Sequence, residues 1–204
     1  GLDKLLKHRW VNTVSYFGKG DSNPQHERNH ETQHLRDYGL FDKDKLQHHW
    51  ISQCDKASVK WHRGLATDLD INESNSTVTT ANGSKITARL LIDATGYEPV
   101  FLKSPKNWPV AIQTCYGVVG RFNKPPIEKG QFILMDYRCD HLSSKEKAEP
   151  PTFLYAMDLG NDRYFLEETS LGLFPPLTLE TLQSRLKLRL AHKNLEITSL
   201  EHEE

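Results

Sequence analysis

Two adjacent glutamates interrupt an apolar and aromatic stretch near the end of the chain. Glu167 and Glu168 lie within Phe165-Leu-Glu-Glu-Thr-Ser170, a run whose residue types favour a β-strand. Neighbouring strand residues point to opposite faces of a sheet, so at most one of the two can face a given cavity. A carboxyl group in apolar surroundings has a raised pKa and can stay protonated, as a general acid must. The pair indicates acid chemistry, and the alternative is an edge strand with two exposed charges.

A third carboxylate lies in another apolar run of the same half of the chain. Asp136 follows Ile133-Leu-Met and precedes Tyr137-Arg138. The pattern predicts a strand of the same sheet, which makes Asp136 a further candidate for the site. An ion pair with Arg138 or another cation accounts for the residue equally well, so both interpretations stay open.

Three histidines recur at intervals of four in the most polar stretch of the chain. His26, His30 and His34 form two overlapping H-E-x-x-H patterns, which on a helix can bind zinc and activate a water molecule. A zinc-protease helix is buried on one side, whereas this stretch has no apolar stripe. We therefore predict a solvated histidine-rich loop and no metal site. A non-enzymatic metal-binding module is the alternative from a different functional class.

A small-residue turn follows the clearest hairpin signal in the sequence. Asn82-Gly83 separates two β-prone runs within 77–88 and predicts a tight turn. The continuous apolar run Leu90-Leu-Ile92 then predicts a strand buried on both faces, and it ends in Ala94-Thr95-Gly96. In two-dinucleotide-type flavoproteins such a turn lets the backbone approach the cofactor closely. The alternative is an ordinary strand that ends at a glycine turn. The G-x-G-x-x-G fingerprint of dinucleotide binding is absent from the chain.

Periodicity predicts the elements that would position these residues. The second half favours a broad antiparallel sheet followed by an amphipathic helix that Thr178 caps, with Leu182, Leu186 and Leu190 on one side. In the first half we predict a helix near 2–10, a strand at 11–17, a polar loop at 18–39, a helix after Asp42 and a strand at 59–71. The strands of the second half are expected near 110–122, 131–137, 152–158 and 163–170.

Length and composition narrow the class of protein. The 204 residues include 26 Lys and Arg against 27 Asp and Glu, a formal net charge of -1 that gives no reason to expect a nucleic-acid partner. No stretch approaches the roughly 20 apolar residues of a membrane-spanning helix. The 3 widely spaced cysteines exclude a disulfide framework. The chain opens at Gly1 and closes after an unfinished apolar alternation, from which we expect an internal fragment of a longer protein.

Several longer motifs occur together and in order. They are Leu6-Lys-His-Arg-Trp10, Gln113-Thr-Cys-Tyr-Gly117, Met135-Asp-Tyr-Arg138, Pro151-Thr-Phe-Leu-Tyr-Ala-Met157 and Phe165-Leu-Glu-Glu-Thr-Ser-Leu171. Together they resemble the plant and cyanobacterial lycopene cyclase family, which also holds capsanthin-capsorubin synthase and neoxanthin synthase. The resemblance runs from about Leu5 to the last residue. Within the family, the Phe-Leu-Glu-Glu-Thr-Ser segment resembles β-type rather than ε-type cyclases.

The resemblance implies a mixed α+β or α/β fold of the FAD-dependent hydroxylase type and an isomerase (intramolecular lyase) reaction without net redox change. An acid protonates a terminal double bond of a linear carotene, the carbocation closes to a β-ionone ring, and a proton is lost. By resemblance, Glu167 is the acid, with Glu168 and Asp136 as its electrostatic partners. Ala94, Thr95 and Gly96 would contact FAD in its reduced form, with NAD(P)H as a source of reduction.

The resemblance also implies a division of the chain and a place in the cell. Residues 1–105 would be part of the FAD domain, 106–176 the substrate sheet, and 177–204 a helix and the return to the FAD domain. Lycopene or a related carotene is the implied substrate. We expect docking on a membrane surface without spanning it, in a cyanobacterium or a plastid. The helix at 178–193 could contribute, although a helix covering the sheet is favoured.

Two alternatives within the family stay open from the sequence. One is a lycopene ε-cyclase, and the other is a paralogue of the neoxanthin or capsanthin-capsorubin synthase type. By itself, a fragment that lacks the main dinucleotide fingerprint is expected to be inactive.

Overall fold

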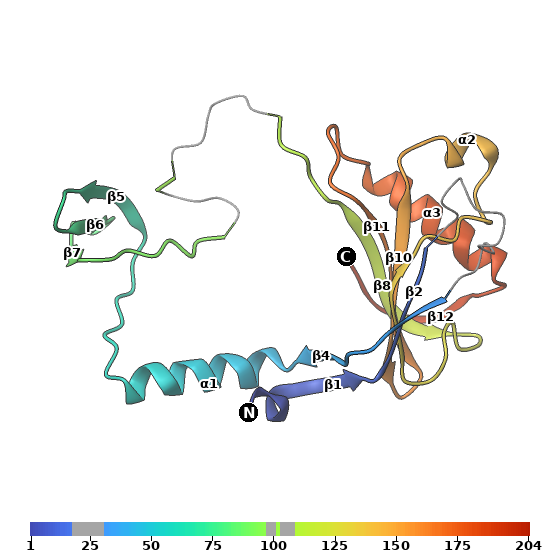
Figure 1. Cartoon of the computed structure of the whole chain (residues 1–204), viewed down its shortest axis with the longest axis horizontal. Coiled ribbons are helices and arrows are strands. Elements are labelled where there is room, and N and C mark those ends of the chain that lie inside the picture. The colour runs from blue at the N-terminus through green and yellow to red at the C-terminus, as the bar shows by residue number, and fades with distance from the viewer. Residues whose placement is uncertain (18–30, 97–100, 103–108) are drawn as a thin grey trace. The chain divides into compact units, whose positions relative to one another are not determined.

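The computed structural model describes residues 1–17, 31–96, 101–102 and 109–204 (Figure 1). His26 and His30 lie outside the described residues. The chain divides into two compact units, one formed by residues 1–47 with 109–204 and the other by residues 48–108. The first unit therefore joins strands from both ends of the chain.

A seven-stranded sheet forms the centre of the first unit, in the order β12-β8-β11-β10-β9-β2-β3. All neighbouring strands run antiparallel except β2 and β9, which are parallel. The four strands predicted for the second half of the chain are confirmed. The bounds are β2 Asn12–Tyr16, β3 Glu31–His34, β8 Cys115–Phe122, β9 Gln131–Asp136, β10 Thr152–Gly160, β11 Arg163–Ser170 and β12 Ile197–Glu203.

Helix α3 (Leu179–His192) packs on one face of this sheet, against β8 and β11 (Figure 1). Thr178 caps it by accepting a hydrogen bond from the Thr181 backbone N–H at 3.3 Å. Leu182, Leu186 and Leu190 are buried against the sheet. The helix is therefore the predicted cover of the sheet, and its apolar stripe is not available to a membrane. No helix within the described residues is long and apolar enough to cross one.

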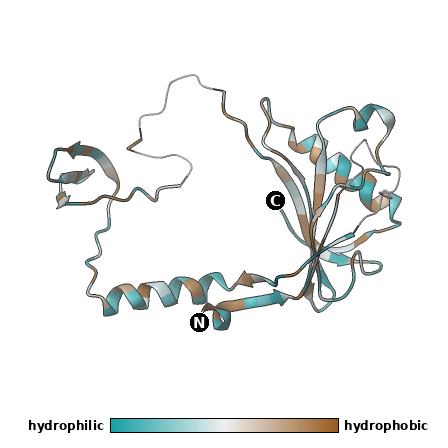
Figure 2. Ribbon diagram, in the orientation of Figure 1, coloured by the Kyte–Doolittle hydropathy of each residue, from teal (hydrophilic) through white to brown (hydrophobic). Residues whose placement is uncertain are grey.

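The core between α3 and the sheet is built by the inward-facing residues of the central strands. Hydrophobic residues recur along these strands and at intervals along α3 (Figure 2). Burial alternates along β11, where Tyr164, Leu166 and Glu168 are buried and the residues between them are partly exposed. This alternation is the period of two that the pleat imposes on side chains. The apolar core residues include Val14, Val118, Ile133, Leu154, Ala156, Leu166, Leu186 and Leu190.

The start of the chain differs from the predicted helix. A short 3-10 helix, η1 (Leu2–Leu5), leads into strand β1 (Leu6–Trp10), which pairs antiparallel with β4 (Tyr38–Phe41). Strands β3 and β4 likewise replace part of the loop predicted at 18–39. Pairing with a partner strand overrides weak local preference here, because helical spacing and alternation are hard to distinguish in short apolar runs.

Helix α1 (Lys43–Lys56) starts where the sequence predicts, and the division between the two units falls within it. The carboxylate of Asp42 accepts a hydrogen bond from the Lys45 backbone N–H at 3.1 Å, as an N-cap does. The side chains of Trp50 and Ile51 on this helix are exposed, whereas Leu46 and Cys54 are partly buried. The first unit also contains α2 (Ser144–Lys147), a single turn closed by a capping box between Ser143 and Glu146.

A three-stranded sheet of β5 (Ala66–Ile71), β6 (Ser76–Thr80) and β7 (Lys85–Ala88) forms the second unit. The predicted Asn-Gly hairpin is confirmed, but only Gly83 adopts a positive φ, at 84°. Asn82 instead accepts a hydrogen bond from the Ser84 backbone N–H through its side chain. This local bond stabilises the turn without the left-handed conformation at both central residues.

The buried strand predicted at residues 90–92 is wrong for this structure. The segment forms no strand, and the side chains of Leu90 and Ile92 are 75% and 78% exposed. A strand that is buried on both faces needs neighbours on each edge and covering layers. None of the described residues supplies a neighbouring strand for this segment.

Candidate functional site

The two adjacent glutamates of β11 lie on opposite faces of the seven-stranded sheet. Glu167 is opposite Tyr155 of β10 and Gly117 of β8, whereas Glu168 is opposite Leu154 and Tyr116. Because paired residues of neighbouring strands share a face, the register divides the two carboxylates between the helix-covered face and the other one. The sequence argument that only one glutamate can face a given cavity agrees with this geometry.

The face that carries Glu167 also carries a continuous row of aromatic rings, which we call the aromatic face. Neighbouring ring centroids lie 5.1–6.3 Å apart along Phe17, Tyr137, Phe153, Tyr155 and Phe132. These separations are typical of favourable aromatic pairs. Phe132 continues the row to Trp10 and Tyr38. Trp10, Phe132 and Phe153 are buried within this row, whereas Phe17 is exposed and Tyr137 and Tyr155 are partly exposed. The face therefore combines apolar π-systems with one half-buried carboxyl group.

Glu167 is held by its neighbours on β8 and β11. The Thr169 hydroxyl donates a hydrogen bond to Glu167 Oε1 at 2.6 Å. Cys115 lies on the same face beside them, because it pairs with Thr169 between β8 and β11. Burial, together with the charge and hydrogen bond of Glu167, raises the pKa of Cys115 to about 11. The thiol therefore stays protonated at neutral pH and remains a donor toward the carboxyl group.

Tyr155 stands directly beside Glu167 on the adjacent strand. Burial raises the pKa of its phenol, and the charges of Glu167 and Tyr38 raise it further. The ring is thus neutral at physiological pH. A neutral ring with its π-cloud near a carboxyl group can stabilise a positive charge that develops close by.

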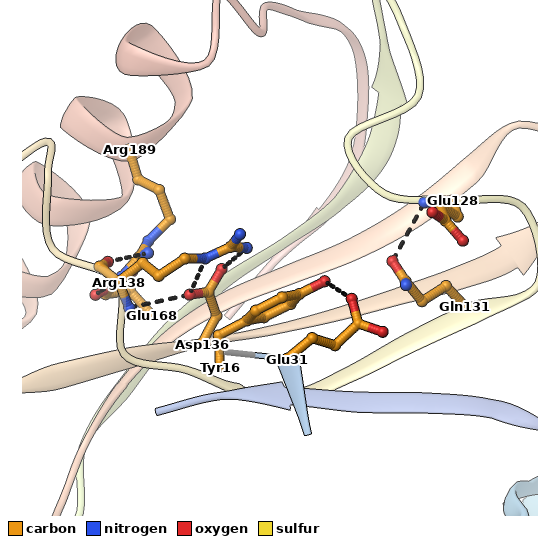
Figure 3. A network of polar contacts seen from close by, with 8 residues as sticks. All are labelled: Tyr16, Glu31, Glu128, Gln131, Asp136, Arg138, Glu168 and Arg189. Carbon is orange, nitrogen blue, oxygen red and sulfur yellow. Dashed lines mark hydrogen bonds and ion pairs between the residues drawn. The ribbon is translucent and has the colours of Figure 1, made fainter. Parts of the chain in front are cut away.

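Glu168 is fully buried under α3 and is bound on both oxygens (Figure 3). Arg189 donates from Nε to Oε2 at 2.8 Å and from Nη2 to Oε1 at 2.9 Å, and the Thr152 hydroxyl donates to Oε1 at 2.6 Å. Such a bidentate pair is among the strongest and most specific of protein hydrogen-bond arrangements. Glu168 is thereby committed to holding α3 on the sheet and does not face the aromatic rings.

Asp136 is also fully buried and lies on the same side of the sheet as Glu168. Its carboxylate accepts hydrogen bonds from Arg138 Nε at 2.8 Å and Nη2 at 2.5 Å. Burial raises the pKa of Asp136, but the hydrogen bonds and charge of Arg138 outweigh it and leave the pKa below its ordinary value. The ion pair that the sequence left open for Asp136 is therefore present.

The guanidinium of Arg138 has a second partner on its other side. Its central carbon lies 3.6 Å from the centroid of the Tyr16 ring, and the Tyr16 hydroxyl donates to Glu31 at 2.8 Å (Figure 3). Burial and the hydrogen bond to Glu31 raise the pKa of Tyr16 to about 12. This network joins β2, β3 and β9 along one end of the sheet. Because these contacts link the three strands to one another, we assign the network a structural role.

The structure therefore does not bring the three predicted carboxylates together. The sequence placed Glu168 and Asp136 as electrostatic partners of Glu167, but the pleat puts both on the helix-covered face, where each is paired with an arginine. The sequence reasoning did not single out Arg185 and Arg189. Both are buried residues of α3, each three residues after a buried leucine, and that spacing was the available signal.

Thr169, Cys115 and Gly117 are further residues around Glu167 that sequence reasoning did not single out. Cys115 pairs with Thr169, and Gly117 pairs with Glu167, between β8 and β11. Once β11 is known to pair with β8, the spacing of two residues places all four on one face. The strand pairing itself is not readable from local sequence.

The remaining sequence candidates belong to other elements of the chain. His34 is on strand β3 rather than a helix, with its Nε2 2.8 Å from the Ser15 hydroxyl. Within the described ranges no group of three or more histidine, cysteine or acidic side chains could hold a metal ion. The turn Ala94-Thr95-Gly96 belongs to the second unit, and the Asp93 carboxylate accepts hydrogen bonds from both the backbone and the hydroxyl of Thr95.

The whole sequence matches one family profile, described as "Lycopene cyclase protein", over residues 1–204. A lycopene beta cyclase of Synechococcus elongatus is 46% identical over all of this chain and 47% of its own length. The chloroplastic lycopene beta cyclase of Arabidopsis thaliana is 35% identical over 83% of this chain and 35% of its own. A neoxanthin synthase of Solanum tuberosum is 30% identical over 100% of this chain and 40% of its own length. The chain thus spans less than half the length of these relatives.

Two solved structures share the fold at low sequence identity. The halogenase PltM, crystallised with phloroglucinol and FAD, superposes with a TM-score of 0.56 and 9% identity over 97% of this chain and 43% of its own. The peptidyl tryptophan dihydroxylase QhpG superposes with a TM-score of 0.53 and 12% identity over 100% of this chain and 43% of its own length. The fold class predicted from the sequence, a fragment of an FAD-dependent hydroxylase-like fold, is thereby confirmed.

Proposed function

This chain belongs to the lycopene cyclase family, and on that premise we propose that it supplies the acid and the substrate-facing sheet of a lycopene β-cyclase. The observation that carries the proposal is the placement of Glu167. Among the three candidate carboxylates it alone lies on the aromatic face, half-buried and without a cationic partner among the described residues, whereas Glu168 and Asp136 are bound to arginines.

The proposed reaction begins with proton transfer from the carboxyl group of Glu167 to the terminal double bond of a linear carotene. The π-electrons of that bond form the new C–H bond and leave a carbocation on the neighbouring carbon. A second double bond of the same molecule attacks this carbon and closes a six-membered ring. Loss of a proton from the ring then restores a neutral product, so the reaction is an isomerisation with no net oxidation or reduction.

The aromatic face suits the charge that develops in this reaction. Tyr155 and Phe165 flank Glu167, and their π-clouds can stabilise a carbocation without acting as nucleophiles. An apolar surface also excludes water, which would otherwise capture the cation as an alcohol. The row of rings from Phe17 to Phe132 has the apolar character of a polyene. For these reasons we assign the substrate to this face.

The turn at Ala94-Thr95-Gly96 fits a flavin. Gly96 has a φ of 96°, and a Cβ placed there would have no atom within 4 Å, so the backbone is open to close approach by a ligand. Ala94, Thr95 and Gly96 would hold part of FAD. The bound cofactor, reduced at the expense of NAD(P)H, would supply electron density that stabilises positive charge.

A carotene is almost insoluble in water, and we propose that the whole protein meets its substrate at a membrane surface of a cyanobacterium or plastid. The relatives that support this assignment are a cyanobacterial protein and proteins described as chloroplastic. The apolar stripe of α3 does not serve as the docking element in this account, because the sheet covers it.

The proposed function is tested by expressing the full-length protein that carries this chain in lycopene-accumulating bacteria. We expect carotenes with β-rings, identified by chromatography and mass spectrometry, because the segment of the β-type cyclases is present around Glu167. A product with ε-rings would make the protein an ε-cyclase. Unchanged lycopene, together with conversion of a supplied epoxy-carotenoid, would contradict the proposal in favour of a neoxanthin or capsanthin-capsorubin synthase activity.

A further inference from the structure

We propose that Thr169, Cys115 and Gly117 form a cradle that positions the carboxyl group of Glu167 for proton transfer. The inference rests on the proposed function and adds three positioning residues to it. Thr169 and Cys115 act as hydrogen-bond donors, and Gly117 provides the space in which the glutamate side chain lies against β8. None of the three needs to touch the substrate.

The donors are fixed by the sheet itself. Cys115 and Thr169 are paired residues of β8 and β11, and Thr169 is two residues from Glu167 on the same face. The Thr169 side chain is buried, and its hydroxyl lies 2.6 Å from Glu167 Oε1. Since both donors stand on paired strands rather than loops, the orientation of the carboxyl group is set before the substrate arrives.

Gly117 supplies space that no other residue would leave. A Cβ at this position would lie 3.0 Å from Phe165 Cε2, 3.2 Å from Glu167 Cβ and 3.3 Å from Glu167 Cγ. These separations are shorter than ordinary carbon contacts, so even alanine would displace the Phe165 ring or the stem of Glu167. Gly117 has no positive φ, and its role here is therefore spatial rather than conformational.

The donors become more effective as the reaction proceeds. When the proton leaves Glu167 for the double bond, negative charge grows on the carboxyl oxygens, and the hydrogen bonds from Thr169 and Cys115 become charge-assisted. Interactions that strengthen toward the transition state accelerate the reaction. The same contacts keep the carboxylate in place while the ring proton is lost.

The split between kcat and KM, together with rescue by conservative variants, separates this role from a purely structural one. A donor whose hydrogen bond strengthens only as the proton leaves Glu167 contributes to kcat and not to KM. The other groups that face this site are Tyr155 from β10 and, beside Cys115, Glu204 from the end of the chain.

The test uses the full-length protein, with kcat and KM for cyclisation measured separately. Cys115→Ala and Thr169→Val should each lower kcat about tenfold with little change in KM, the loss expected for one charge-assisted hydrogen bond. Cys115→Ser and Thr169→Ser keep a donor and should restore most of kcat. Cys139→Ala, which removes an exposed thiol, should change neither kcat nor KM.

The space at Gly117 is tested by a matched pair of glycine substitutions. Gly117→Ala should lower the rate constant more than tenfold by displacing Glu167, with little change in KM. Gly172→Ala should be silent, because a Cβ there meets only Ala111 at an ordinary 3.6 Å. Melting temperatures are measured alongside. If Thr169→Val fails to accumulate as folded protein, the smaller change Cys115→Ala decides the donor role.

Outcomes that overturn the cradle are distinct from those that overturn the function. If Glu167→Gln abolishes cyclisation while the Cys115, Thr169 and Gly117 variants keep the wild-type kcat, the cradle is wrong and the acid assignment stands. A lowered kcat that the serine variants do not restore also contradicts the cradle. If Glu167→Gln itself retains activity, the proposed function fails.

Discussion

Replacing Glu167 by glutamine is expected to reduce cyclisation by about 10²- to 10⁴-fold, the range that a positioned general acid contributes. Glutamine preserves the size of the side chain and can still accept a hydrogen bond from Thr169. It cannot release a proton of comparable acidity to a double bond. The measurement is the rate of β-ring formation by the full-length protein, with equal amounts of folded protein confirmed by thermal melting.

The matched control for this prediction is a glutamate with no proposed role in the chemistry. Glu201→Gln changes a surface carboxylate of β12 that pairs with Arg163 at 2.6 Å, and we expect wild-type rates from it. A Glu167→Gln variant that keeps more than about a tenth of the wild-type rate would contradict the assignment.

The second large effect is expected on stability rather than on chemistry. Arg189→Met should lower the free energy of unfolding by about 3–5 kcal/mol, because it leaves the buried carboxylate of Glu168 without its cation. The side chains of both partners are almost fully buried, at 3% and 0% exposed. Urea denaturation of the full-length protein, followed by the fluorescence of its tryptophans, measures the change.

Two variants separate loss of the buried pair from loss of any ion pair. Arg163→Met breaks the surface pair with Glu201, whose side chains are each 33% exposed, and should cost about 1 kcal/mol or less. Combining Arg189→Met with Glu168→Gln removes the stranded charge, and we expect part of the stability to return. If Arg189→Met and Arg163→Met lower the free energy of unfolding equally, Glu168 is not the buried carboxylate of an ion pair with Arg189.

The hairpin formed by β10 and β11 was predictable from local sequence signals. The alternating runs near 152–158 and 163–170 have the turn Gly160-Asn161 between them, and these local signals are sufficient for a hairpin. Strands β3 and β4 were not predictable, since Glu31–His34 is polar and is held in place by pairing with β2. The segment at 90–92 shows the converse, because apolar residues alone do not make a strand without partners.

The candidate carboxylates of the site were predictable from the sequence, but the residues that contact each of them were not. Alternation along β11 was enough to separate Glu167 from Glu168, but it does not say which face α3 covers. That choice depends on Arg189, which reaches Glu168 across 21 positions of sequence. The donors around Glu167 depend on the pairing of β8 with β11, a contact between segments some 50 residues apart. Local patterns do not encode contacts of this range.

The central claim is that ring closure starts with a proton carried by Glu167, and incorporation of solvent deuterium tests it most directly. A carboxyl group exchanges its proton with solvent, so the full-length protein supplied with lycopene in deuterated water should place one deuterium in each new β-ring. Mass spectrometry of the cyclic product measures this label. We expect stoichiometric labelling in the wild-type protein and no labelled product from Glu167→Gln. Unlabelled β-rings would contradict an acid-initiated reaction.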